Sequence, residues 1–558
     1  MVTLTRLLFS LWQLLWVVLK ADAYRLPDPD QNRLPVKLDH ATITGIIDGS
    51  VESFLGVPYA QPPVGDLRLQ LPQLRESYNG ALNATMFGNK CFQQASSALG
   101  SLPPQAAQGL TPFLEFLSQT ANVTESEDCL NLNVVRPANV STDAKLPVLF
   151  WIYGGGFTDG SNAITAYNGT AIVKRSIELN EPVIWVALNY RLDAFGFLGG
   201  KEIKEAGLGN LGLQDQRTAL RWVQKFISAF GGDPAKVTIW GESAGSISVF
   251  LHLYANGGDT EGLFRAGMMS SGTSTPVGDI IETQNIYDFI VDRVGCSNTS
   301  DTLACLRTVS ADDLLAAVND TPSIGAAVGI LSPFMPHVDG VFVTMPPMHL
   351  PSNATIADIP LITGDTKDEG TLLSFGSLNV TTDDKFASYV SQHLFPGSTI
   401  ADVADVLRLY PSDPAAGSPF DTGSANAFSP QFKRIAAVSG DWFFNGPRRH
   451  FLDEVSANHT VYNFLSARGN FTGVGDFHGT DLLNVLRGGD MADYFISFVN
   501  HLDPSAGTGT KVHWPPYKPS TRSTLQFNDG SMSLNITVDD QRLEGTTELT
   551  SLALRFPH

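Results

Sequence analysis

From about residue 146 onward, short runs of consecutive hydrophobic residues alternate with longer segments in which hydrophobic residues recur every three or four positions. Most of the short runs contain β-branched or aromatic residues and are bounded by Gly or Pro, a pattern typical of buried strands. Strands are therefore expected at 148–153, 183–188, 237–240, 266–270, 360–363 and 461–465.

The longer segments have the spacing of helices. Residues 213–230 carry hydrophobic side chains along one face and stop at the turn sequence Gly231-Gly232-Asp233-Pro234. A second helix is expected at 246–254. Strands and helices in alternation predict an α/β fold with a parallel sheet covered on both faces. Because the chain shows neither an internal repeat nor a long linker, residues 24–558 are expected to form one domain.

One strand-to-helix turn carries candidate chemistry. Gly241-Glu242-Ser243-Ala244-Gly245 lies between the strand at 237–240 and the helix at 246–254. A Ser flanked by Gly at such a turn is typical of the nucleophile elbow, where a strained corner exposes the hydroxyl and Gly leaves room for the backbone. Ser243 is therefore the candidate nucleophile. The pentapeptide alone is weak evidence, so the interpretation depends on its flanks.

The flanks contain further motifs in a fixed order. They are Glu127-Asp128-Cys129-Leu130, Tyr153-Gly154-Gly155-Gly156-Phe157, the segment from Asn189-Tyr190-Arg191 to Phe197-Leu198, and Phe230-Gly231-Gly232-Asp233-Pro234 before the elbow. Together they resemble the signatures of type-B carboxylesterases and lipases, over about residues 45 to 514. The resemblance implies an α/β-hydrolase fold with a large, mostly parallel central sheet. The pattern is most similar to that of the secreted fungal lipases and esterases.

The resemblance implies a catalytic triad of Ser243, Glu369 and His478. A Ser hydroxyl needs a base to accept its proton and an acid to orient that base. In α/β-hydrolases these groups follow in the order Ser, acidic residue, His. Glu369 follows a predicted strand, and His478 lies in a Gly-containing segment further on. The alternatives are the acids Asp365 and Asp368 and the histidines His450 and His459.

The resemblance also implies an oxyanion hole, made by the backbone N–H groups of Gly155, Gly156 and Ala244. Only Gly lets such a loop approach the reacting carbon closely. Ser243 would form an acyl-enzyme that water then hydrolyses, without a metal or a cofactor. The expected substrates are small-molecule or lipid esters, and sequence leaves open whether the enzyme is a lipase or a carboxylesterase.

Other positions that match the family are expected to be structural. Arg68 resembles an Arg that pairs with Glu127, and Arg191 resembles the partner of Asp215. Buried ion pairs of this kind occur without any chemical role. Ser271 matches a position that supports the triad acid, Glu369.

Two positions depart from the common family pattern. Asn131 stands where an aromatic residue is usual, and Tyr153 opens the glycine loop where animal members often have His. Neither change removes a catalytic atom. Both resemble the fungal secreted branch of lipases and esterases.

The segment 91–129 is a candidate lid, because in the lipases of this family the corresponding loop covers the site. Within it, residues 109–117 place hydrophobic side chains at 110, 113, 114 and 117, which is helical spacing. Such a helix either opens toward a lipid surface or packs permanently on the core. The segment contains no Trp, so it lacks the aromatic platform with which cholinesterases hold a quaternary ammonium group.

The four cysteines allow three pairings. Cys91–Cys129 and Cys296–Cys305 are expected, because each pair closes one local loop. A metal site is the alternative, but neither a Cys-x-x-Cys motif nor clustered His supports it. Disulfides agree with an oxidising compartment.

The N-terminus resembles a secretory signal peptide at 1–23, with Arg6, an apolar run at 7–19 and a small-x-small cleavage site at 21–23. The run is too short for a membrane span, and an uncleaved anchor is the alternative. Eleven glycosylation sequons agree with a secreted protein. They are at Asn83, Asn122, Asn139, Asn168, Asn298, Asn319, Asn353, Asn379, Asn458, Asn470 and Asn535.

The chain has 558 residues and a formal net charge of −20. Such a surface repels phosphate backbones and anionic membranes, which argues against nucleic-acid binding. Two alternatives to ester hydrolysis share the scaffold. A catalytically silent binding protein of the neuroligin type commonly lacks the active Ser and carries a membrane span, unlike this chain. An acyltransferase would use the same acyl-enzyme with an alcohol acceptor.

Overall fold

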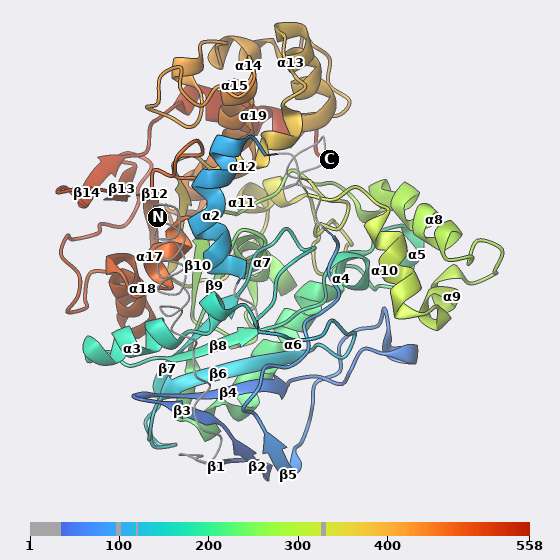
Figure 1. Ribbon diagram of the computed structural model, residues 1–558, viewed down its shortest axis with the longest axis vertical. Coiled ribbons are helices and arrows are strands. Elements are labelled where there is room, and N and C mark those ends of the chain that lie inside the picture. The colour runs from blue at the N-terminus through green and yellow to red at the C-terminus, as the bar shows by residue number, and fades with distance from the viewer. Residues whose placement is uncertain (1–34, 96–101, 119–120, 325–330) are drawn as a thin grey trace, which may run out of the picture.

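The computed structural model describes residues 35–95, 102–118, 121–324 and 331–558 (Figure 1). The expected signal peptide at 1–23 lies outside these residues. Over the described part of the chain, no helix is both long enough and apolar enough to cross a membrane.

A mixed sheet of 11 strands forms the centre of the molecule. In spatial order its strands are β14 (Leu534–Val538), β13 (Ser523–Asn528), β12 (Val461–Ala467), β11 (Leu361–Thr366), β10 (Ala266–Ser270), β9 (Gly232–Glu242), β7 (Leu146–Ile152), β8 (Ile184–Leu188), β6 (Asn131–Pro137), β4 (Val51–Pro58) and β3 (Ile46–Asp48). All neighbours from β8 to β13 are parallel. The pairs at the two edges are antiparallel.

The six predicted strands are confirmed as β7 to β12, within a few residues at their ends. The prediction of a mostly parallel sheet also holds, because the parallel strands occupy its centre. The strands at the antiparallel edges were not predicted. They include short or partly exposed strands, such as β3 and β14, in which the continuous hydrophobic signal is absent. A separate sheet of three strands was also missed; it contains β1 (Pro35–Leu38), β2 (His40–Thr44) and β5 (Asn79–Asn83).

Helices surround the sheet. The longer ones are α2 (Pro104–Ser118), α3 (Thr170–Glu178), α6 (Leu211–Phe226), α7 (Ala244–Tyr254), α8 (Gln284–Arg293), α10 (Ala311–Asn319), α15 (Phe432–Gly440), α16 (Gly446–Val455), α18 (Asp490–His501) and α19 (Leu543–Arg555). The shorter ones are α4 (Asp193–Phe197), α5 (Lys201–Glu205), α9 (Thr302–Thr308), α11 (Leu350–Asn353), α12 (Gly370–Leu373), α13 (Asp383–Tyr389), α14 (Ala404–Leu409) and α17 (Asp481–Val485). The predicted helices at 213–230 and 246–254 correspond to α6, with a 3₁₀ turn after it, and to α7.

Helices cover both faces of the central sheet, as neighbouring positions of β9 demonstrate. Trp240 packs on Phe495 of α18, with ring centroids 5.3 Å apart. Ile239, one residue earlier, is the register partner of Gly267 on the neighbouring strand β10. A Cβ added to Gly267 would lie 3.4 Å from Val249 of α7, so this position faces α7. Successive strand residues point to opposite faces. Therefore α18 and α7 lie on opposite faces of the sheet.

Both expected disulfides are present. Cys91 is bonded to Cys129, and Cys296 is bonded to Cys305. The first bond joins the two ends of the segment that contains α2. The side chains of the sequon asparagines are exposed except at Asn168 and Asn535, which are half-buried.

Both expected ion pairs are present and buried. Arg68 Nε lies 2.6 Å from Glu127 Oε1, and Arg191 Nη2 lies 2.7 Å from Asp215 Oδ1. The second pair joins the segment after β8 to helix α6. These two ion pairs hold separate segments of the chain together. The side-chain hydrogen bonds of Glu127 and Asp215 go to Arg68 and Arg191, outside the cavity described below.

Candidate active site

Ser243 occupies a strained corner between β9 and α7. Its φ of 55° and ψ of −122° lie outside the regions that non-Gly residues usually adopt. A Cβ at Gly241 would collide with the backbone of Gly245, and a Cβ at Gly245 would collide with the backbone of Ile152 in β7. The two Gly residues therefore let the backbone turn sharply enough to present the Ser243 hydroxyl.

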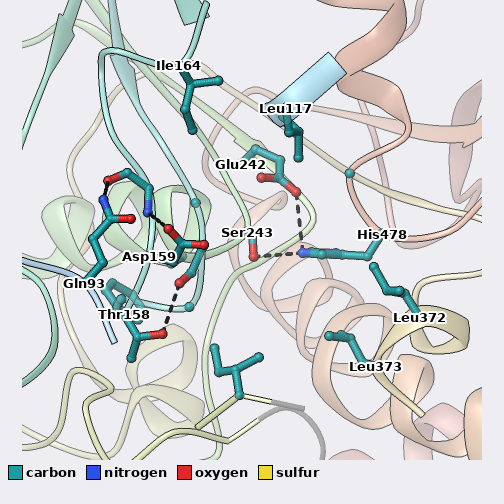
Figure 2. Close-up of a pocket in the computed structure, with 18 of the residues that line it drawn as sticks. Gln93, Leu117, Thr158, Asp159, Ile164, Glu242, Ser243, Leu372, Leu373 and His478 are labelled. Atoms are coloured by element: carbon teal, nitrogen blue, oxygen red, sulfur yellow. Dashed lines mark hydrogen bonds and ion pairs between the residues drawn. The ribbon is translucent and has the colours of Figure 1, made fainter. Parts of the chain in front are cut away.

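Three side chains from distant parts of the chain meet at the carboxyl ends of parallel strands. His478 Nε2 lies 2.8 Å from Ser243 Oγ, and the two side chains point toward each other in Figure 2. His478 Nδ1 lies 2.6 Å from Glu369 Oε2. Glu369 follows β11, and His478 lies in the loop after β12. The predicted nucleophile, base and acid are thus in contact in the expected order.

The second oxygen of Glu369 is also held. Glu369 Oε1 accepts hydrogen bonds from the Ser271 hydroxyl at 2.6 Å and from the Thr366 N–H at 2.7 Å. All three residues are buried. Each oxygen of the Glu369 carboxylate therefore has its own partners. These contacts fix the orientation of the carboxylate relative to His478.

The alternative acids lie close in sequence but are bound elsewhere. Asp365 lies 2.6 Å from Arg448. Asp368 accepts hydrogen bonds from the N–H groups of Phe420 and Asp476. Asp368 thereby joins the turn after β11 to the loop that carries His478, instead of contacting the imidazole.

The alternative histidines contact other residues and not Ser243. His450 Nε2 lies 3.0 Å from the Met348 carbonyl oxygen, and His459 lies 3.6 Å from Asp358. Neither residue lines the cavity that contains Ser243.

The glycine loop lies directly against Ser243. A Cβ on Gly154 would approach the Ser243 Cβ to 2.8 Å. Gly155 and Gly156 have φ values of 104° and 61°, which favour Gly. Within the described residues, the N–H groups of Gly155, Gly156 and Ala244 have no hydrogen-bond acceptor. Ala244 is also the first residue of α7, where the helix dipole favours negative charge.

Two further carboxyl groups surround His478. Glu242 Oε1 lies 3.4 Å from His478 Nε2, the same nitrogen that contacts Ser243 (Figure 2). Asp481 is buried at the start of α17, and neither of its carboxyl oxygens has a hydrogen-bond partner among the described residues. Burial raises the pKa of Glu242 to about 8 and that of Asp481 to about 7. Burial lowers the pKa of His478, but the charges of Glu369 and Glu242 outweigh it and raise this pKa to about 9.

We expect Glu242→Gln to move the acid limb of the kcat/KM profile to lower pH by about one unit. His478 must be neutral to accept a proton. Glu242 is ionised above about pH 8, the range in which His478 loses its proton. There the substitution removes a negative charge that raises the pKa of His478, so a larger fraction of the imidazole is neutral at a given pH. The plateau is expected to fall several-fold, because the same charge stabilises the imidazolium of the transition state. The measurement is kcat/KM for p-nitrophenyl butyrate from acidic to alkaline pH.

The matched control is Asp143→Asn, which makes the same chemical change on an exposed residue between β6 and β7. It should leave the acid limb in place. An acid limb that stays fixed or moves to higher pH in Glu242→Gln would show that Glu242 does not act on His478.

Ser243 opens into a cavity of about 690 Å³, within the size range of ligand sites. Much of its lining is apolar; this part includes Phe113, Leu114, Leu117, Ile164, Ile247, Ile324, Met335, Leu372, Leu373, Phe443, Phe444 and Leu482. Phe444 also packs on the His478 ring, with centroids 4.7 Å apart. The cavity is therefore suited to an apolar acyl group next to the Ser243 hydroxyl.

Helix α2 forms part of the cavity wall and contains the helix that was predicted at 109–117. Leu110 is fully buried, whereas Phe113, Leu114 and Leu117 line the cavity. The Phe113 ring meets the edge of Phe477 at 5.0 Å, next to His478. In Figure 1, α2 runs across the molecule near α12 and α17. The apolar face of α2 thus covers the site in this structure.

The two positions that depart from the family pattern lie outside the cavity lining. Asn131 is buried and donates hydrogen bonds to the carbonyl groups of Asn89 and Cys129. Tyr153 stacks on Tyr190, with centroids 4.6 Å apart, and accepts a hydrogen bond from Tyr190 at its carbonyl oxygen. Tyr153 therefore supports the glycine loop through Tyr190 and does not line the cavity.

Sequence reasoning assigned no role to three acids that the structure places near Ser243. Glu242 lies inside the elbow motif, Asp481 lies three residues after His478, and Asp159 lies three residues after Gly156. The signal that could have identified these acids is their closeness in sequence to the predicted catalytic residues. The sequence alone does not tell whether such neighbours point into the site or away from it.

Comparison with known proteins agrees with this geometry. Residues 32–545 match the carboxylesterase family. Lipase 4 of Diutina rugosa is 43% identical over 510 residues, which cover 87% of this chain and 90% of that protein. The secreted triacylglycerol lipase LIP1 of Gibberella zeae is 39% identical over 533 residues, which cover 91% of this chain and 89% of that protein.

A likeness of structure accompanies the likeness of sequence. The crystal structure of Aspergillus niger EstA matches with a TM-score of 0.78 and 26% identity, over 94% of this chain and 99% of that one. The fold is therefore that of an α/β-hydrolase, and the chain belongs to the carboxylesterase family and is a carboxylic-ester hydrolase.

Proposed function

We propose that this protein is a secreted hydrolase of apolar carboxylic esters, of the lipase type, that acts through Ser243, His478 and Glu369. The observation that carries the proposal is the 2.8 Å contact between Ser243 Oγ and His478 Nε2, which both line a largely apolar cavity. The named lipase relatives support the substrate class.

In the proposed mechanism, Ser243 Oγ attacks the ester carbonyl while His478 Nε2 takes its proton. Glu369 accepts the Nδ1–H hydrogen bond, which fixes the tautomer and stabilises the imidazolium. The N–H groups of Gly155, Gly156 and Ala244 bind the developing oxyanion. His478 then gives its proton to the leaving alcohol. Water attacks the acyl-enzyme by the same route in reverse and releases the acid.

The lipase proposal depends on α2 and its position over the cavity. Phe113, Leu114 and Leu117 face the cavity in this structure. Movement of α2 away from the site would expose these three side chains to solvent together. A lipid surface would then cover the apolar area that the movement exposes. We therefore infer that the segment 91–129 is a lid, and that the protein contacts lipid interfaces.

Secretion is supported by three features. Two relatives are named as secreted lipases. The protein has two disulfide bonds, which persist in oxidising compartments. The sequence at 1–23 resembles a signal peptide. The exposed sequon asparagines would be accessible to glycosylation in that pathway.

The test compares p-nitrophenyl esters from butyrate to palmitate with an emulsified triacylglycerol, with Ser243→Ala as the inactive control. Hydrolysis of long-chain esters, with a rate that rises steeply once the substrate exceeds its solubility, is the expected result. Hydrolysis confined to short soluble esters, without a rise at the oil interface, would refute the lipase type and leave a soluble carboxylesterase.

A further inference from the structure

The wall of the cavity has two chemically different sides. Figure 2 shows Gln93, Thr158 and Asp159 on one side of Ser243, with Ile164 above them, and Leu372 and Leu373 on the other side, beyond His478. An ester bound at the nucleophile extends in two directions, its acyl chain one way and its alcohol the other. The apolar side suits the acyl chain, so the polar side is left for the alcohol.

Asp159 is held close to the oxyanion loop by its backbone. Its N–H donates to the Gly155 carbonyl oxygen at 3.0 Å, and its own carbonyl oxygen lies 2.2 Å from where a Cβ on Gly155 would be. Asp159 Oδ1 accepts a hydrogen bond from the Gly160 N–H at 2.7 Å. The turn therefore fixes this carboxylate beside the loop that faces the ester carbonyl.

The polar side offers hydrogen-bond acceptors that lack donors. Within the described residues, neither Asp159 Oδ2 nor Gln93 Oε1 accepts a hydrogen bond. Gln93 is oriented by its Nε2, which donates to the Gly160 carbonyl oxygen at 2.5 Å. Asp159 lines the cavity and is exposed there. A ligand that supplies hydroxyl donors would satisfy both acceptors in place of water.

A hydroxyl group fits this wall better than a charged group does. The Asp159 carboxylate would repel the carboxylate of a fatty acid. A cationic alcohol would meet the ammonium group of Lys90, which also lines the cavity, acts on the same carboxylate and is paired with Glu125 at 3.0 Å. Thr158 adds a hydroxyl that donates only a long hydrogen bond, at 3.5 Å, to the Gly155 carbonyl oxygen.

We propose that Gln93, Thr158 and Asp159 bind the alcohol part of the ester and select alcohols that keep a free hydroxyl group, as in a monoester of a polyol. This inference rests on the proposed ester hydrolysis at Ser243. It assigns the preferred substrate class on the alcohol side, where monoacylglycerols are the simplest examples.

The experiment compares monodecanoylglycerol with methyl decanoate, because the two esters share an acyl chain and differ only in the alcohol. The wild-type protein is expected to prefer monodecanoylglycerol in kcat/KM by about tenfold, the size of one hydrogen bond to a charged acceptor. Asp159→Ala is expected to reduce that ratio by about tenfold. Asp159→Asn keeps an acceptor for the Gly160 N–H, so it preserves the turn and should reduce the ratio by a smaller factor.

Asp143→Ala removes an exposed carboxylate outside the site and is the matched control; the ratio should not change. Equal rates on both esters in the wild-type protein would overturn the inference, as would an equal loss on both esters in the two Asp159 variants. If the Asp159 variants lost more kcat/KM on decanoylcholine than on monodecanoylglycerol, the inference would be overturned in favour of a cationic alcohol. Failure of the wild-type protein on both decanoate esters would instead refute the proposed function itself.

Discussion

Replacement of Ser243 by alanine is expected to lower kcat by about 10⁶-fold. The substitution removes the oxygen that lies 2.8 Å from His478 Nε2, and no acyl-enzyme can then form. His478→Ala should have an effect of similar size, since the hydroxyl without its base is a poor nucleophile. Initial rates with p-nitrophenyl butyrate, at enzyme concentrations high enough to detect slow turnover, provide the measurement.

The double variant distinguishes a cooperating pair from two independent contributors. Because Ser243 and His478 act in one step, the double substitution should be no slower than either single one. His450→Ala is the control, since His450 contacts the Met348 carbonyl oxygen and does not line the cavity. It should retain most of its activity. If Ser243→Ala kept more than about a hundredth of the wild-type kcat, another residue would have to be the nucleophile.

The parts of the fold that sequence predicts well are those with one strong local signal. Strands β7 to β12 are buried on both sides by helices, so their hydrophobic runs are continuous and easily recognised. Edge strands such as β14 are partly exposed and alternate in burial, and the same reasoning passes over them. The Ser243 turn is also local, because the Gly residues that it requires lie within two positions of the nucleophile.

The rest of the site is not local. Glu369 and His478 were assigned through resemblance to a family, since nothing within their own segments shows that they meet Ser243. The contacts arise because β9, β11 and β12 are parallel and end at the same edge of the sheet. Which side of the cavity is polar depends on how the turn after Gly156 folds back on Gly155, and this depends on tertiary structure.

Glu369→Gln is expected to lower kcat by about 10⁴-fold, less than substitution of Ser243 or His478. The Ser271 hydroxyl and the Thr366 N–H both donate to Glu369 Oε1, so the oxygen of the new amide stays on that side. The amide NH₂ then faces His478 Nδ1, which must become an acceptor. The proton moves to Nε2, and this tautomer cannot accept a proton from Ser243.

Two further variants separate orientation of the imidazole from structural support. Ser271→Ala frees Glu369 Oε1 from one donor and should lower kcat by about tenfold. Asp368→Asn weakens the link between the turn after β11 and the His478 loop, so it should lower the free energy of unfolding more than it lowers kcat. These effects are measured by denaturant unfolding and by initial rates on one ester. A kcat for Asp368→Asn below that of Glu369→Gln would transfer the role of the triad acid to Asp368.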